Sequence, residues 1–177
     1  ANHFTGYALT NYGNSEAGLR FEARNGQGDL AGVLPYNPAF FELPQGEQFS
    51  LLAREVFGSG QESLEDLSQS WVRVLSAQPQ LGSFTQIGNG LGGRQTRMDG
   101  AVAFTSPSNR LFFTRVYSGL ESYPVQSGMA LAPAETWIAL ANPADEPVNL
   151  VFRLHGAEGE LLVPEAGLSL NPRGGYV

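Results

Sequence analysis

The sequence predicts an all-β protein: an antiparallel β-sandwich with one short helix, followed by a partial second copy of the same unit. Short apolar runs recur along the chain, and turn-forming residues separate them, which is typical of sandwiches and barrels. Glycine (22) and proline (11) punctuate these runs without forming a periodic tract. Hydrophobic residues make up 42% of the chain and charged residues 15%, which indicates a folded body.

The expected strands are short, alternate apolar with polar residues, and end at turn formers such as Asn25–Gly28. In the first two thirds of the chain they lie at Phe4–Asn11, Gly18–Arg24, Asp29–Leu34, Ala39–Leu43, Trp71–Ser76, Gln80–Gly88, Gly100–Phe104 and Leu111–Tyr117. In the last third they lie at Thr136–Ala141, Asn149–His155, Glu160–Val163, Gly167–Leu170 and Gly175–Val177. Within the core we expect Trp71, Phe21 and Phe152 to be buried.

One stretch, Glu47–Phe57, has the spacing of a helix. Its apolar residues fall on one helical face: Phe49, Leu52, Val56 and Phe57. Gly58 is placed to end this helix, and Gln61–Gln69 is expected to add a further turn. We expect the helix to cover an open end of the sandwich.

An internal repeat predicts the second copy. Shifted by 131 residues, Tyr7–Leu30 lies on Ile138–Leu161 without a gap, with seven of twenty-four positions identical. In each copy a strand ends in Ala-Leu-x-Asn, where the asparagine can bond its own backbone and open a turn. A second strand and a glycine hairpin follow, as expected of a repeated supersecondary unit. We therefore expect one unit over residues 1–118 and an incomplete copy over 119–177.

These motifs support a resemblance. Ala8-Leu9-x-Asn11, Leu43-Pro44-x-Gly46, the run Phe49–Phe57 and the strand Trp71–Ser76 together resemble tandem immunoglobulin-like β-sandwich repeats of large secreted bacterial surface proteins. The resemblance implies an extracellular, immunoglobulin-like setting without catalytic residues. The second copy departs from the pattern because it reaches Val177 without the helix or the later strands.

Composition excludes several partners. The net charge is −7, all ten basic residues are arginine, and no basic stripe is available to bind nucleic acid. No apolar stretch approaches the roughly eighteen residues of a membrane span, so no membrane insertion is expected. The chain has no cysteine, and it begins at Ala1 without methionine, as after signal-peptide removal or in a trimmed sequence. We expect a secreted or extracellular protein, associated with the cell surface.

No catalytic site, metal or cofactor is expected, and the chain is not expected to be an enzyme. Its two histidines, His3 and His155, stand without the further ligands that a zinc site needs. No strand–Gly-x-Ser-x-Gly–helix context supports a nucleophilic serine.

Two functions remain open. The first is structural or adhesive, as a subunit or segment of a cell-surface or filamentous assembly whose partners are copies of itself or other surface proteins. Its interface would lie in the second copy, at Leu168, Leu170, Tyr176 and Val177, completed by a neighbouring subunit unless that copy packs on the first within one chain. The alternative is a carbohydrate- or ligand-binding module. Its glycan would stack on loop aromatics, for which the candidates are Tyr36, Tyr117 and Tyr123.

Overall fold

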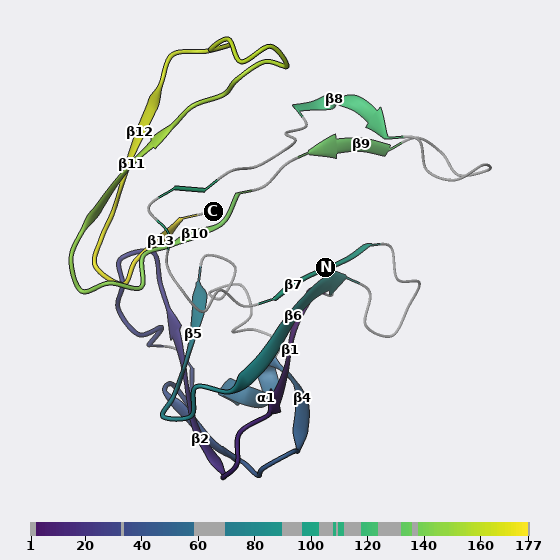
Figure 1. Cartoon of the computed structure of the whole chain (residues 1–177), viewed down its shortest axis with the longest axis vertical. Coiled ribbons are helices and arrows are strands. Elements are labelled where there is room, and N and C mark those ends of the chain that lie inside the picture. Colours follow the sequence, from purple (N-terminus) through teal and green to yellow (C-terminus); the bar gives the residue numbers. More distant parts are fainter. Residues whose placement is uncertain are drawn as a thin grey trace.

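The structure is a computed structural model and describes residues 3–32, 34–58, 70–89, 97–102, 108, 110–111, 118–123, 132–135 and 138–176. The described residues form mostly antiparallel β-sheet, with one short helix among them (Figure 1). The expected all-β class and low helix content are confirmed.

The first sheet has four antiparallel strands in the order β4-β1-β6-β7. These strands are β1 (His3–Asn11), β4 (Gln48–Leu52), β6 (Leu81–Asn89) and β7 (Arg97–Val102). β1 lies inside the sheet because β6 pairs along its whole length on one edge and β4 pairs on the other.

The second sheet has three antiparallel strands in the order β3-β2-β5. They are β2 (Ala17–Arg24), β3 (Ala39–Leu43) and β5 (Trp71–Ser76), close to the bounds that the sequence predicts. Alternate residues of β2 point inward, as the pleat requires. The inward positions are Ala17, Leu19, Phe21 and Ala23, and all four are buried.

The core lies between the two sheets, and Phe21 is at its centre with no exposed surface. Its ring centroid lies 6.0 Å from that of Tyr7 in β1, 5.6 Å from that of Phe41 in β3 and 6.1 Å from that of Phe49 in β4. Aromatic pairs at such separations add about 0.5–1.5 kcal/mol each beyond the area they bury. Phe21 therefore joins three strands from both sheets into one core.

The predicted helix over Glu47–Phe57 is wrong in its first half. Gln48–Leu52 forms strand β4, and only Ala53–Phe57 forms the helix α1. The edge of β1 offers unpaired backbone groups, and β4 satisfies them by pairing there. α1 ends at Gly58, which adopts the left-handed conformation as the sequence predicts (φ 65°). Gln61–Gln69 lies outside the described residues.

Two further strand predictions are wrong. The described residues of Asp29–Leu34 have only an isolated bridge from Leu30 to Arg24, and Glu160–Val163 has only the matching bridge from Leu161 to His155. In the first case the Asn37 side chain supplies a different support. Its amide nitrogen donates to the carbonyls of Ala23 (2.8 Å) and Ala31 (3.0 Å), and its oxygen accepts from the Ala23 N–H.

The C-terminal third adds three two-stranded sheets. The first pairs β8 (Ser118–Tyr123) with β9 (Ala132–Glu135), which the sequence does not predict. The second pairs β10 (Leu140–Ala141) with β13 (Gly175–Tyr176). The third is the hairpin of β11 (Val148–Phe152) and β12 (Ala166–Leu170), which projects from the two-sheet body at the upper left of Figure 1. Of the expected strand Leu111–Tyr117, only Leu111 is described, and it is not in a strand.

The pairing registers of the first copy recur in the second. β2 pairs with β3 from Ala17↔Leu43 to Phe21↔Ala39, and β11 pairs with β12 from Val148↔Leu170 to Phe152↔Ala166. β1 pairs with β4, and β10 with β13, in matching registers as well: Leu9↔Phe49 and Thr10↔Gln48 correspond to Leu140↔Tyr176 and Ala141↔Gly175. The internal similarity of the sequence is therefore a repeated pattern of strand pairing.

The asparagine turn also recurs, as the sequence predicts. The Asn11 oxygen accepts from the N–H of Gly13 (2.8 Å), and its amide donates to the carbonyls of Ser15 and Leu43. Asn142 makes a closely similar set of bonds, accepting from Ala144 (3.1 Å) and donating to the carbonyls of Glu146 and of Asn171, one residue beyond the position equivalent to Leu43. Both asparagines are buried. Each side chain thus ties the turn after its first strand to the end of the third strand of its unit.

Candidate functional site

The three candidate ligand-binding tyrosines do not form a described cluster. Tyr36 is 64% exposed, and its ring lies against Gly58, so close that a Cβ there would be 2.4 Å from the ring. Tyr123 ends β8 opposite Ala132, but its side chain lies outside the described residues, as does the whole of Tyr117.

The four candidate assembly residues have different environments. Leu170 is buried, Leu168 is half-buried opposite Leu150, and Tyr176 is exposed opposite Leu140. Val177 lies outside the described residues.

The segment Asn171–Gly175 lies against the first copy of its own chain, and we call this contact the seam. The Trp71 indole N–H donates to the carbonyl of Arg173 (3.0 Å), and the Asn171 amide donates to the side chain of Gln27 (2.7 Å). A Cβ on Gly28 would lie 2.0 Å from the Pro172 carbonyl oxygen, so the backbones approach as closely as glycine allows. Trp71 is only half-buried, so the prediction that it is buried is wrong.

A buried charge cluster lies on the outer side of β2. Glu22 and Arg24 are both nearly inaccessible, and the Arg24 guanidinium donates two hydrogen bonds to Glu22 Oε2 (2.9 and 2.7 Å) and one to the Gly28 carbonyl (2.6 Å). Arg20 pairs with the other Glu22 oxygen at 2.7 Å. These hydrogen bonds and ion pairs offset the loss of hydration of the buried charges, so the cluster is explained by its structural role in the sheet.

A second ion pair supports the seam from the other side. Arg173 holds a positive φ of 55°, which is uncommon for a residue other than glycine, and its Nε pairs with Asp145. The hydrogen bond and the charge of Arg173 lower the pKa of the Asp145 carboxyl. Both side chains are exposed, so this pair fixes the turn geometry more than it adds stability.

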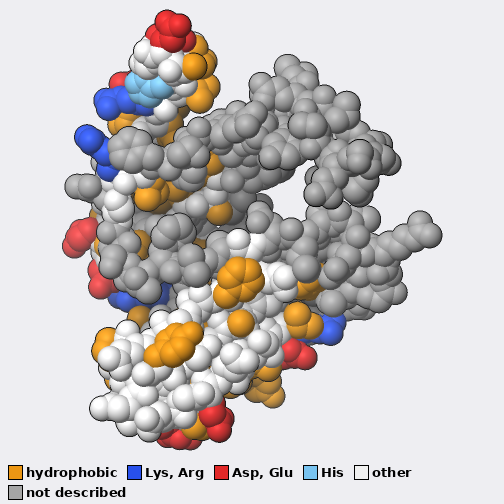
Figure 2. Space-filling view, turned by 45° about the vertical axis from the view of Figure 1, so that its right-hand side comes forward, with side chains coloured by type: hydrophobic (Ala, Val, Ile, Leu, Met, Phe, Trp, Pro, Cys, Tyr) orange, Lys and Arg blue, Asp and Glu red, His pale blue; other side chains and the backbone are white. Residues whose placement is uncertain are grey.

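The projecting hairpin carries exposed apolar side chains (Figure 2). We call this set the hairpin patch: Val151 (59% exposed), Leu154 (38%), Leu161 (47%), Leu162 (54%) and Val163 (48%). The equivalent residues of the first copy are charged, small or better covered: Arg20, Ala23, Leu30, Ala31 and Gly32. Exposed apolar side chains gathered on one hairpin in this way mark an interaction site more often than scattered ones do.

The inner face of the second copy is also less covered than that of the first. Phe152 is half-buried, so the prediction of its burial is wrong, whereas its counterpart Phe21 has no exposed surface. The difference has a structural cause. β5 pairs with the outer edge of β2 in the first copy, but no strand in the described part of the chain pairs with the same edge of β11.

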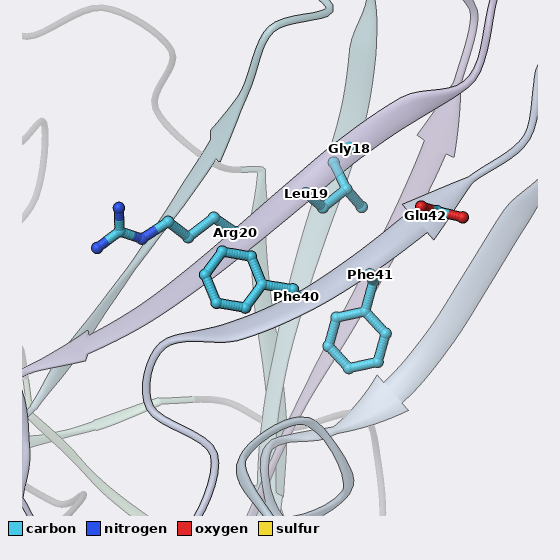
Figure 3. A pocket seen from close by; sticks show the side chains of 6 residues that line it. All are labelled: Gly18, Leu19, Arg20, Phe40, Phe41 and Glu42. Carbon is cyan, nitrogen blue, oxygen red and sulfur yellow. The ribbon is translucent and has the colours of Figure 1, made fainter.

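A shallow depression of about 620 Å³ lies on the outer face of β2 and β3 (Figure 3). The exposed ring of Phe40 lines it, and the Arg20 guanidinium carbon lies 5.9 Å from the ring centroid, in the range of a cation–π contact. Glu42 lines the far side, and Gly18 leaves open space between them, since a Cβ there would meet nothing within 4 Å. Sequence reasoning does not find this site, because the pattern of Ala39–Leu43 predicts a strand but does not show that Phe40 faces outward.

Within the described ranges, no group of three or more His, Cys, Asp or Glu side chains is placed to hold a metal ion. His155 is exposed, and its Nδ1 lies 2.9 Å from the Gly159 carbonyl oxygen, where Arg24 contacts Gly28 in the first copy. Among the same residues, no helix has the length and apolar character needed to cross a bilayer.

Comparison of the chain with protein-family models, with curated proteins and with solved structures finds no match in any of the three.

Proposed function

We propose that this chain is a structural or adhesive module of an extracellular assembly: an immunoglobulin-like β-sandwich unit joined to an open second copy that contacts neighbouring polypeptides. The hairpin patch is the single observation that carries the proposal. At positions where the first copy has Ala23 and Ala31, both buried, the second copy has Leu154 and Leu162, both exposed. The extracellular setting rests on the resemblance to secreted surface repeats.

The seam supports a mechanical role for the first copy. It holds Asn171–Gly175 to Trp71 and to the Asn25–Gly28 turn, and so fixes the base of the projecting hairpin. A hairpin held at its base and apolar along its length presents its side chains to another molecule at a small entropic cost, because the backbone is already ordered.

The patch should drive association of the purified chain in water. We expect sedimentation velocity to show reversible association that grows with concentration, and electron microscopy of the same samples to show the resulting assemblies. The double variant Leu154→Glu, Leu162→Glu should remain monomeric because it places two charges in the contact. Leu111→Glu is the matched control, since Leu111 is equally exposed (50%) but lies outside the hairpin.

A wild-type chain that stays monomeric at every concentration would contradict the proposal. So would equal association of the wild-type chain and the hairpin double variant, because the contact would then lie elsewhere. Equal loss of association in Leu111→Glu would show a general effect of added charge and not a patch.

The Arg20–Phe40 depression favours a second candidate function, a ligand-binding module. An exposed ring with a cation and a carboxylate beside it can stack on the apolar face of a sugar and bond its hydroxyl groups. Phe40→Ala should then abolish binding of an oligosaccharide measured by titration calorimetry, while the unfolding midpoint stays unchanged because Phe40 is 69% exposed.

A further inference from the structure

The first copy shows what completes a unit of this fold. β5 pairs antiparallel with the outer edge of β2, with Phe21 opposite Val74 and Glu22 opposite Arg73. Because β11 repeats the register of β2 against its other neighbour, the same geometry locates a strand position beside β11 that no described strand of the chain occupies. There Phe152 and Arg153 stand where Phe21 and Glu22 stand in the first copy.

The backbone of β11 is arranged to accept that strand. Two residues beyond the end of β11, the Leu154 carbonyl accepts from the Leu162 N–H, so this carbonyl points toward the β12 side of the hairpin. Successive residues of a strand direct their N–H and C=O groups to opposite edges. Val151 and Arg153 therefore direct theirs to the free edge, where no residue of the described part of the chain bonds them.

The charge of Arg153 indicates which kind of strand can pair with the free edge of β11. In the first copy the opposed residues Glu22 and Arg73 have opposite signs. The second copy has Arg153 at the Glu22 position, so β5 of another copy of this chain would set Arg73 against Arg153. Like charges directly opposite each other destabilise a strand pair, and opposite charges stabilise it. A second copy of this chain is therefore a poor donor of the missing strand.

We propose that the free edge of β11 binds an extended strand of a separate polypeptide. That strand runs antiparallel to β11, presents apolar side chains at alternate positions toward the inner face, and places a carboxylate opposite Arg153. It is a case of β-augmentation, in which main-chain bonds give affinity and side chains give the register. The inference rests on the proposed function and names the kind of partner that this assembly takes up.

The test uses the full chain and two synthetic peptides. Both peptides have the sequence of residues 70–77, and one carries Arg73→Glu. Fluorescence anisotropy of the labelled peptides measures affinity, and hydrogen exchange by NMR measures protection of the Val151 and Arg153 amides. We expect the Arg73→Glu peptide to bind about three- to tenfold more tightly than the unchanged one, with protection of those two amides.

Two protein variants examine the edge and the charge separately. Val151→Pro removes an outward N–H while leaving the bonds to β12, so it should abolish binding of both peptides. Arg153 pairs with Glu165 at 2.5 Å, and the double variant Arg153→Glu, Glu165→Arg keeps that pair with its polarity reversed. It should reverse the peptide preference. Hairpin formation in each variant is checked from the NMR shifts of β12.

Three results would overturn the inference: no binding of either peptide, equal binding of both, or binding that survives Val151→Pro. Association of the chain through β11 that neither peptide displaces would also overturn it, because a second copy would then be the occupant. Each of these results leaves the proposed function standing if association still depends on Leu154 and Leu162. If association no longer depends on Leu154 and Leu162 but the peptide preference is unchanged, the proposed function is contradicted and the inference about the β11 edge still holds.

Discussion

The two equivalent phenylalanines, Phe21 and Phe152, should differ in their contribution to stability, although they hold the same position in the two copies. Phe21→Ala removes a ring with no exposed surface that touches three other rings. Such truncations cost about 3–5 kcal/mol, because the loss of transfer free energy adds to that of a cavity. Phe152 is only half-buried, so water can fill the space that its removal leaves. We expect Phe152→Ala to cost about 1–2 kcal/mol.

Guanidinium denaturation followed by far-ultraviolet circular dichroism measures both costs. The relevant quantity is the difference in the free energy of unfolding between each variant and the wild-type chain. If Phe21→Ala does not fold, Phe21→Leu keeps most of the volume and should still cost more than Phe152→Leu. Equal losses at the two positions, or a larger loss at Phe152, would refute the conclusion that only the first copy has a complete core.

Three further predictions address the turns, the seam and one titrating group. Asn11→Ala should cost about 2–4 kcal/mol in denaturation, because it leaves buried backbone groups without partners. Gly28→Ala should release the seam and raise proteolysis near Pro172, whereas Gly159→Ala, at a similar positive φ but with open space around it, should only add local strain. Burial raises the pKa of the Tyr7 phenol, so folding stability should be intact below about pH 10 and fall above it by up to about 1.4 kcal/mol per pH unit, because the unfolded chain ionises first. The Tyr7→Phe variant should lose this pH-dependent part of the folding stability. Denaturation of both proteins below and above about pH 10 would show the difference. Lysine does not titrate in that range here, because all ten basic residues are arginine.

Much of the first copy could be predicted because its strands alternate clearly. The inward residues of β2 are apolar and its outward residues are polar or glycine, so period and bounds were both readable. The segment before α1 is ambiguous in the sequence for a specific reason. Phe49 and Leu51 alternate as a strand should, but Phe49, Leu52 and Val56 also fit a helix, and the choice depends on the free edge of β1.

The candidate site was less predictable. The repeat offset locates the equivalent positions over Tyr7–Leu30, including the turn of Asn142 and the glycine of the hairpin at Gly159. Whether a residue is buried depends instead on a strand from a distant part of the sequence. β5 pairs with β2 beside Phe21, whereas no described strand pairs with the same edge of β11 beside Phe152. The seam depends on contacts across more than a hundred residues, such as Trp71 with Arg173, for which no local pattern exists.

The seam also has a consequence for sequence divergence. Its closest approaches involve backbone atoms: the Arg173 carbonyl receives the indole proton, and Gly28 and Gly174 face the carbonyls of Pro172 and Gly26. Apart from the Trp71 indole and the Asn171–Gln27 pair, this joint depends on backbone contacts, so most other surface positions of both copies can change without loosening it. A single added methyl group at Gly28 would open it. Tolerance to mutation in this protein should therefore be broad at the exposed positions of the strands and narrow at a few glycines of the seam, as it is at the buried strand positions.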